Sequence, residues 1–198
     1  MNGTCNYILT KMEKEGLSFA ECLKEAQRLG YAEADPAFDI EGNDTAHKLA
    51  ILTTLAFGNR IAADDIYLEG ITNISIEDIH AAAELGYRIK LLGVAQRTDT
   101  GIEQRVHPTM VPVDSVIAQV DGVTNAVAIE SDVLGELLMV GPGAGGGATA
   151  SSVLGDFADI AKSRPGAQRV PVLGHPAKAL EPYRRRRCRA TRAAISSA

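Results

Sequence analysis

A group of carboxylates directly before a lysine is the first candidate for chemistry in this 198-residue chain. Asp44 and Lys48 are four residues apart, so on a helix they share one face and can form an ion pair. A lysine amine held in this way could take the hydroxyl proton of an alcohol while a hydride leaves the same carbon. Further acids precede the pair and could bind a substrate ammonium: Glu33, Asp35, Asp39 and Glu41. The alternative is a solvated acidic loop followed by an ordinary surface ion pair.

Helices are predicted on both sides of this acidic loop. Apolar spacing indicates one helix over residues 4–15, and Ser18 and Glu21 have the spacing of a capping box that opens a second helix, which ends at Gly30. The loop itself, residues 31–43, contains Pro36 and Gly42 as helix breakers. Asn43 or Asp44 is then predicted to cap a helix that reaches about Phe57.

Strands are predicted in the second half of the chain. After a helix over residues 75–85, the apolar period changes to two, which indicates strands over residues 87–96 and 102–111 around a turn at residues 99–101. Residues 125–130 and 134–140 indicate two more strands. The predicted fold class is therefore α+β, a mainly antiparallel or mixed sheet with helices packed on one face.

A run of glycines follows the last predicted strand. Gly141, Gly143 and Gly146 match the GxGxxG pattern of dinucleotide-binding folds, and a helix is predicted over residues 150–161. The second strand and ribose-binding acid expected about twenty residues later are missing, because the chain reaches Arg164-Pro165-Gly166 instead. Two interpretations stay open: backbone amides near Gly145 and the helix start after Thr149 contact a cofactor, or the glycines only allow close packing.

The last 35 residues differ in charge from the rest. Residues 1–163 hold 11 Lys and Arg against 24 Asp and Glu, whereas residues 164–198 hold 9 against 1, so balances of -13 and +8 give the net charge of -5. We predict one domain over residues 1–163 and a disordered basic linker and tail over 164–198. The run Arg184–Arg187 lacks aromatic neighbours and the body is acidic, which favours a solvated tail over nucleic-acid binding.

Composition excludes several classes of protein. At 45% hydrophobic residues the chain can bury a core, but no apolar run approaches the roughly 18 residues that a membrane helix needs. No secretory signal begins the chain, so we expect a cytoplasmic location. The three cysteines lack CxxC spacing and the four histidines lack metal-ligand spacing, which predicts reduced thiols and no metal site.

Together, several of these segments are similar to one enzyme family. Gly30 to Pro36, then Asp39, Gly42, Asp44 and Lys48, resemble the signature of homoserine dehydrogenases, and residues 2–9, 69–71, 85–92 and the glycine run match in the same order. The resemblance covers about residues 2–182. It implies interconversion of L-homoserine and L-aspartate 4-semialdehyde with NADP or NAD, in the biosynthesis of threonine, methionine and isoleucine.

The resemblance also implies residue roles. Lys48 is the proton donor and acceptor at the substrate oxygen, and Asp44 orients it. Glu33 and Asp39 hold the amino-acid end of the substrate. Thr4 and Tyr31 lie along the pocket. We therefore expect Lys48, Glu33 and Asp39 to share one cavity.

The chain also departs from the family pattern. The family begins with a nucleotide-binding unit that carries the glycine fingerprint and a further lysine, and many members continue into a domain that senses threonine. We therefore expect the main cofactor-binding segment to lie outside this chain, and the isolated chain to show little activity. The family's catalytic regions associate through their sheets, which predicts a homo-oligomer. The alternatives are a non-catalytic dimerisation module and an amino-acid-binding fragment of the same family.

Overall fold

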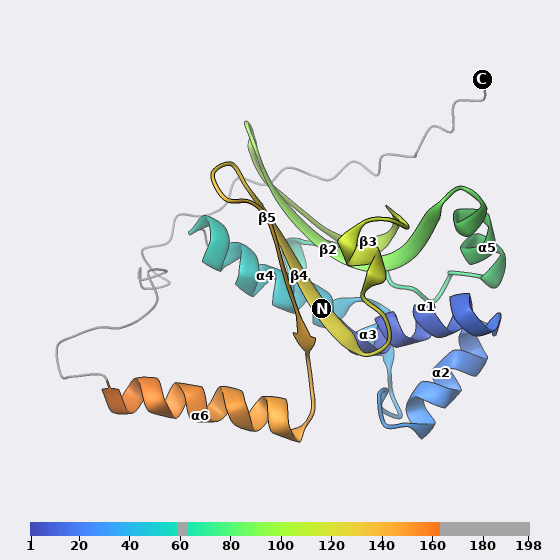
Figure 1. Cartoon of the computed structure of the whole chain (residues 1–198), viewed down its shortest axis with the longest axis horizontal. Coiled ribbons are helices and arrows are strands. Elements are labelled where there is room, and N and C mark those ends of the chain that lie inside the picture. The colour runs from blue at the N-terminus through green and yellow to red at the C-terminus, as the bar shows by residue number, and fades with distance from the viewer. Residues whose placement is uncertain (59–62, 163–198) are drawn as a thin grey trace.

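The computed structural model describes residues 1–58 and 63–162 (Figure 1). The helices are α1 (Gly3–Glu15), α2 (Phe19–Arg28), α3 (Ala37–Ile40), α4 (Asn43–Phe57), α5 (Ile76–Glu84) and α6 (Gly146–Lys162). The strands are β1 (Tyr67–Leu68), β2 (Tyr87–Thr98), β3 (Gly101–Pro112), β4 (Thr124–Ser131) and β5 (Gly135–Pro142). The basic tail predicted over residues 164–198 lies outside the described residues.

The first two helices begin where side chains cap them. Asn2 caps α1, because its side-chain oxygen accepts a hydrogen bond from the Cys5 amide. The predicted capping box at the start of α2 is confirmed, with Ser18 and Glu21 each bonded to the other's backbone amide. Glycine in the left-handed region ends α1 at Gly16, where the amide donates to the Met12 carbonyl.

The strands form two sheets. The first has the order β1-β3-β2, in which β2 and β3 form the predicted hairpin with a tight turn between Thr98 and Gly101, while β1 runs parallel to β3. The second is the antiparallel pair β4–β5, in the predicted position around Ser131. The α+β prediction is confirmed. The two-residue strand β1 was not predicted, because so short a segment shows no periodicity.

The core lies between the first sheet and the helices α1, α4 and α5. Seven of its residues have no exposed surface: Cys5, Ile8, Met12, Cys22, Ala26, Ile71 and Val106. Helix α4 approaches strand β2 closely at Gly93, where an added Cβ would lie 3.0 Å from Thr45 Cγ2. Glycine at this position therefore sets how near α4, which carries the acid–lysine pair, can lie to the sheet.

Helix α6 lies apart from this body (Figure 1). It begins four residues before the predicted start, and none of its residues is buried. Its exposed apolar side chains are Val153, Leu154, Phe157 and Ile160. In the part of the chain that the structure describes, no helix has both the length and the apolar character needed to span a membrane.

Candidate active site

The helix that carries Lys48 begins at a glycine rather than at a capping side chain. Neither Asn43 nor Asp44 caps α4 as predicted: the N-cap is Gly42, with φ of 88° and no side-chain hydrogen bond. An added Cβ at Gly42 would lie 3.0 Å from Leu68 Cδ1 and 3.1 Å from Val106 Cγ1. The left-handed conformation and the close packing both require glycine here, and the Asp44 carboxylate is left free for other partners.

The Asp44 carboxylate forms an ion pair with Lys48. The Lys48 Nζ atom donates to Asp44 Oδ2 at 2.8 Å, and it also lies 3.3 Å from the Met1 carbonyl oxygen. The side chains are 42% exposed for Lys48 and 22% exposed for Asp44. The predicted i,i+4 pair is therefore formed, with the carboxylate sheltered and the amine open to solvent.

A second carboxylate is joined to this pair by an asparagine. The Asn2 side-chain nitrogen donates to Asp39 Oδ1 at 2.9 Å and to Asp44 Oδ2 at 3.3 Å. Asn2 is only 6% exposed. Two like charges that would otherwise repel each other therefore share one neutral donor. Sequence reasoning missed Asn2, whose only local signal was the N-cap position of the first helix.

Thr4 and Cys5 complete the surroundings of Asp39. Thr4 Oγ1 lies 3.0 Å from Asp39 Oδ2 and 2.8 Å from the Tyr31 carbonyl oxygen, two acceptors that share its single proton. The Cys5 thiol donates to the Asp39 carbonyl oxygen at 3.2 Å. Burial raises the pKa of the Cys5 thiol far above its usual value, with a smaller contribution from Asp39, so this sulfur acts as a neutral donor.

The other predicted substrate residues, Tyr31 and Glu33, make their hydrogen bonds through the backbone. Tyr31 contacts the cluster through its backbone carbonyl oxygen, while its ring packs edge-on against Tyr7. The residue as a whole is 43% exposed. Glu33 is exposed, and its carbonyl oxygen accepts a bond from Gln27. The structure thus gathers Thr4, Asp39, Asp44 and Lys48, and leaves the Glu33 carboxylate outside that group.

A groove of about 380 Å³ opens beside the amine. Lys48 and Met1 line one side of it, and the opposite side is formed by the second sheet and the start of the glycine run, residues 125–127 and 139–143. Neither Glu33 nor Asp39 lines this groove, contrary to the shared cavity expected from the sequence. Asp39 connects to it only through the Asn2 amide and Asp44.

Gly143 lies where the glycine run meets the groove wall. A Cβ on Gly143 would lie 1.4 Å from the side-chain nitrogen of Asn125, so the amide of this β4 residue occupies the space that a larger residue would need. The Asn125 Oδ1 atom is buried and has no hydrogen-bond partner within residues 1–58 and 63–162. Asn125 lines both this groove and a smaller cavity that contains Lys90.

The glycine run then passes into α6 earlier than predicted. Gly145 has φ of 111°, and the Thr149 amide already donates to the Gly145 carbonyl oxygen. Residue 149 therefore lies within the first turn, and the helix does not start after it. The amides without an intrahelical acceptor are those of residues 146–148, by the geometry of any helix start.

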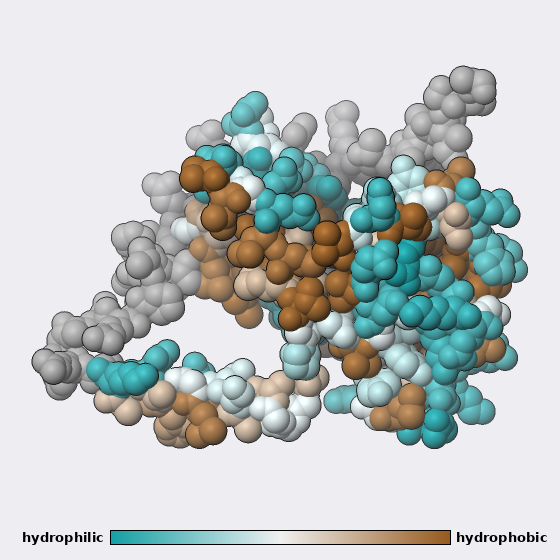
Figure 2. All heavy atoms as spheres, in the orientation of Figure 1, coloured by the Kyte–Doolittle hydropathy of each residue, from teal (hydrophilic) through white to brown (hydrophobic). Residues whose placement is uncertain are grey.

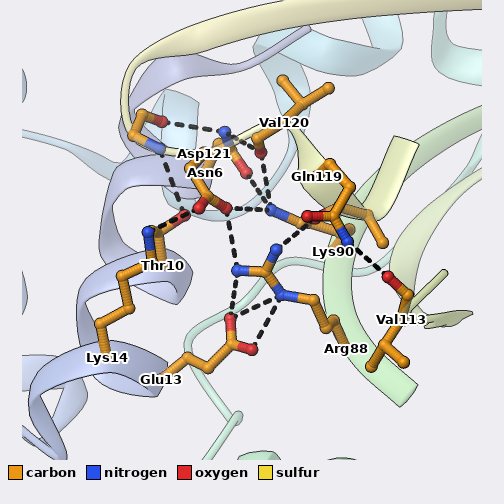
Figure 3. Close-up of polar contacts among 12 residues, drawn as sticks. Asn6, Thr10, Glu13, Lys14, Arg88, Lys90, Val113, Gln119, Val120 and Asp121 are labelled. Carbon is orange, nitrogen blue, oxygen red and sulfur yellow. Dashed lines mark hydrogen bonds and ion pairs between the residues drawn. The ribbon is translucent and has the colours of Figure 1, made fainter. Parts of the chain in front are cut away.

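Ion pairs hold the segment before β4 against α1 and β2 (Figure 3). Arg88 is 9% exposed and donates to both Glu13 and Asp121, at 2.6 Å and 2.8 Å. Its guanidinium also donates to the Ala118 carbonyl oxygen. Burial opposes the charge of Arg88, but hydrogen bonds with Glu13 and then Asp121 leave its pKa raised. The residues that lead into the far wall of the groove are thereby fixed to the core.

Asp121 is the acceptor that joins these cations. It also pairs with Lys14 at 2.6 Å and lies 3.5 Å from the Lys90 amine. Burial raises the pKa of Asp121, but the bonds from Lys14 and Arg88 outweigh it and leave the pKa lowered. Burial, and then the positive charge of Arg88, lower the pKa of Lys90. This network shapes the wall and does not reach the groove.

The arrangement supports proton transfer at a small polar ligand. Lys48 offers an exposed amine whose position is set by Asp44, and Asp44 is in turn set by Asn2. Asp39 and Thr4 provide further hydrogen-bonding groups on one side. Among the described residues, no group of three or more His, Cys, Asp and Glu side chains could hold a metal ion.

Comparisons with known proteins agree on one family. The family model described as homoserine dehydrogenase matches residues 1–158. A curated homoserine dehydrogenase from Neisseria gonorrhoeae is 54% identical over 175 residues, which cover 87% of this chain and 40% of that protein.

Solved structures show the same relationship. A homoserine dehydrogenase from Thiobacillus denitrificans has 51% sequence identity and a TM-score of 0.85, over 91% of this chain and 42% of that one. A hyperthermophilic archaeal homoserine dehydrogenase mutant in complex with NADPH has 32% identity and a TM-score of 0.65, over 84% and 47% of the two chains. The chain thus spans about two fifths of the length of the curated relative and the bacterial structure.

Proposed function

The chain belongs to the homoserine dehydrogenase family, and from this premise we propose that it provides the substrate site for the interconversion of L-homoserine and L-aspartate 4-semialdehyde. The observation that carries the proposal is the 2.8 Å contact between Lys48 Nζ and Asp44 Oδ2 at the edge of an open groove. We place the reaction in the threonine, methionine and isoleucine branch of amino-acid biosynthesis, as the family resemblance implies.

In this proposal Lys48 moves the proton. During oxidation the neutral amine accepts the proton of the homoserine hydroxyl while hydride leaves the same carbon, and in the reverse direction the ammonium returns a proton to the carbonyl oxygen. Asp44 and Asn2 hold the amine in place without occupying its exposed side. The family resemblance assigns the amino-acid end of the substrate to Asp39 and Thr4, with Glu33 from the loop between α2 and α3. Because neither Glu33 nor Asp39 lines the groove, the substrate would have to extend past Asp44 to reach them.

The hydride acceptor in this family is NAD or NADP. The residues at the groove rim fit such a group, because the glycine at 141 leaves the backbone accessible. Just beyond the rim, the amides of residues 146–148 have no intrahelical acceptor and could bind an anion. We therefore assign Gly145 and the first turn of α6, which includes Thr149, to the cofactor side of the groove. When bound, the nicotinamide supplies the two-electron acceptor, and this chain contributes the wall it meets. In the described residues the only parallel strand pairing is β1–β3, so the main nucleotide-binding segment is proposed to come from outside them.

Binding and turnover test the proposal separately. We expect calorimetry to detect L-homoserine binding to the chain, and turnover to appear when the chain is completed with the rest of the Neisseria gonorrhoeae relative's sequence. L-Homoserine should reduce NADP or NAD in the completed protein only. A completed, folded protein without homoserine-dependent turnover would refute the proposal. Binding that is complete without nucleotide, together with no turnover, would instead favour an amino-acid-binding fragment.

Exposed apolar residues favour a homo-oligomer as part of the same proposal. Figure 2 shows apolar side chains gathered over the β4–β5 hairpin. The large apolar residues of the hairpin that are more than two fifths exposed are Ile129, Val133, Leu134, Leu137, Met139 and Val140. A second copy of the sheet would cover them, as the resemblance implies. Light scattering should give at least a dimer, and a monomer at high concentration would contradict this.

We also propose a cytoplasmic location, consistent with the free thiols of Cys5 and Cys22.

A further inference from the structure

Two asparagines lie four residues apart at the start of α1, Asn2 as its N-cap and Asn6 within the helix, and each side chain reaches a different part of the groove's surroundings. Asn2 uses its oxygen to accept the Cys5 amide at 2.8 Å. Because the oxygen accepts this bond from the first turn of α1, the side-chain nitrogen faces away from the helix, toward Asp39 and Asp44. Asn2 therefore ties the start of α1 to the helix that carries Lys48.

Asn6 makes the corresponding contacts on the other side. Its side-chain nitrogen lies 3.0 Å from the Val120 carbonyl oxygen, 2.9 Å from that of Gly122 and 3.3 Å from that of Thr124. The two protons of one amide thus face three carbonyl oxygens, in the loop before β4 and at the first residue of β4, which are more than a hundred residues away in sequence. Figure 3 shows Asn6 and Lys90 converging on the backbone of Val120.

A buried lysine fixes which way the Asn6 amide faces. Lys90 is 5% exposed, and its amine donates to Asn6 Oδ1 at 3.0 Å and to the Val120 carbonyl oxygen at 2.7 Å. An ammonium has only donors to offer, so a flipped Asn6 amide would place its NH2 group against it. The Asn6 nitrogen is therefore held toward the loop.

The loop that Asn6 holds leads directly into the far wall of the groove. Thr124 is the last of its three acceptors, and Asn125, the next residue, lines the groove opposite Lys48. Asp121, in the middle of the loop, is bound by Arg88 and Lys14. One wall of the groove thus depends on contacts made by Asn2, and the other on contacts made by Asn6.

We propose that Asn2 and Asn6 are positioning residues that fix the two walls of the groove relative to each other through α1. Four residues of an α-helix rise about 6 Å, and this spacing hardly changes because α1 is packed in the core. A proton-transfer group and the surface facing it must be held to within about 0.5 Å for efficient reaction. The inference rests on the proposed function only in taking the groove as the substrate site.

Hydrogen exchange on the intact chain tests this without any ligand. Asn6→Asp keeps the size of the side chain and an acceptor for Lys90 but removes the donations to the loop. We expect exchange of the amides in residues 124–127 and 135–142 to become at least about tenfold faster, while the β2–β3 hairpin and α2 stay unchanged. Asn6→Ser tests the same loss without a new charge. Unchanged exchange in β4 and β5, or an equal increase everywhere, would overturn the role of Asn6.

The matching variant for the other wall is Asn2→Asp. Aspartate is also a good N-cap, so α1 should keep its start, but the donations to Asp39 and Asp44 are lost. In the completed protein we expect kcat for homoserine oxidation to fall at least about tenfold, with a shifted pH profile. The new carboxylate lies against Asp39 and Asp44 and should also lower the melting temperature, so Asn2→Ser, which caps α1 without adding a charge, should show the loss of kcat with a melting temperature closer to that of the unchanged protein. An unchanged kcat and pH profile would overturn the role of Asn2.

The two measurements separate this inference from the proposed function. Faster exchange of the β4–β5 hairpin in a chain that never binds homoserine would leave the positioning inference standing and refute the function. If the variants keep homoserine binding and turnover, and hydrogen exchange and the pH profile are unchanged, the proposed function stands and the positioning inference is refuted.

Discussion

Lys48 and Asp44 lie one helical turn apart on α4 and meet at 2.8 Å, with the carboxylate sheltered and the amine 42% exposed. An i,i+4 pair on a protein surface usually contributes little to stability, about 0.3–0.5 kcal/mol. Here the same geometry has a different consequence. It fixes an amine at the edge of a groove whose far wall comes from another part of the chain.

Asp44→Asn tests whether the carboxylate orients the amine. The variant keeps the shape but loses the charge, so we expect kcat of the completed protein to fall about tenfold to a hundredfold, with a smaller change in KM. Steady-state kinetics measure this. Glu15→Gln is the matched control, since Glu15 forms an i,i+4 pair with Lys11 at 3.3 Å far from the groove. An equal fall in kcat in both variants would show that the loss of any helix ion pair lowers activity, and that Asp44 has no special role in orienting the amine.

Asp39→Asn tests the binding of the substrate ammonium. Hydrogen bonds to charged groups contribute about 1.5–3 kcal/mol, so the Kd for L-homoserine should rise about tenfold to a hundredfold. Calorimetry on the chain gives this value directly. Asp35→Asn is the control, because Asp35 only accepts a bond from the Ala37 amide on the exposed loop. A Kd that stays constant in Asp39→Asn would remove Asp39 from the substrate site.

Gly143→Ala tests the close contact at the glycine run. The added methyl group would overlap the Asn125 amide, so β4 and β5 must shift, and we expect a loss of about 1–3 kcal/mol of stability. Gly141→Ala is a matched control two residues away, where an added Cβ meets nothing within 4 Å. Urea denaturation measures both. A loss in Gly141→Ala as large as that in Gly143→Ala would contradict the packing explanation.

Asp121→Asn tests the ion pairs behind the far wall. The folded-state pKa of Asp121 is below the ordinary value of 3.8, so the carboxylate stabilises the fold above that pH and the contribution is lost as pH falls further. The variant should be about 1–3 kcal/mol less stable at neutral pH, since Arg88 and Lys90 lose a partner. In urea denaturation the difference should hold constant above about pH 5 and shrink below pH 3.8. If the difference in stability between Asp121→Asn and the unchanged chain did not vary with pH, the negative charge of Asp121 would not be the cause of that difference.

Local patterns predicted most of the elements. The capping box at Ser18, the turn at the β2–β3 hairpin and the change to a period of two each depend on residues close in sequence, and all three occur in the structure. The α4 cap was wrong, because the close approach of Leu68 and Val106 to Gly42 is set by tertiary packing. No local pattern reports such an approach.

The candidate site divides in the same way. The Asp44–Lys48 pair follows from helical spacing alone, so it could be predicted. Asn2 contacts carboxylates 37 and 42 residues away, and the groove wall at Asn125 lies 77 positions beyond Lys48 in the numbering. Contacts of this range depend on how the elements pack. Glu33 lies outside the cluster for a similar reason, because residue spacing in a loop does not determine which way a side chain points.

The most direct test of the account is the turnover of a Lys48→Ala variant in the completed protein. General acid–base catalysis contributes about 10²–10⁴-fold, so kcat for homoserine oxidation should fall at least about a hundredfold. Calorimetry should meanwhile show homoserine binding within a few-fold of the unchanged chain. A loss of less than about tenfold in kcat would mean that Lys48 does not carry the proton, and the assignment of this groove as the reaction site would fail.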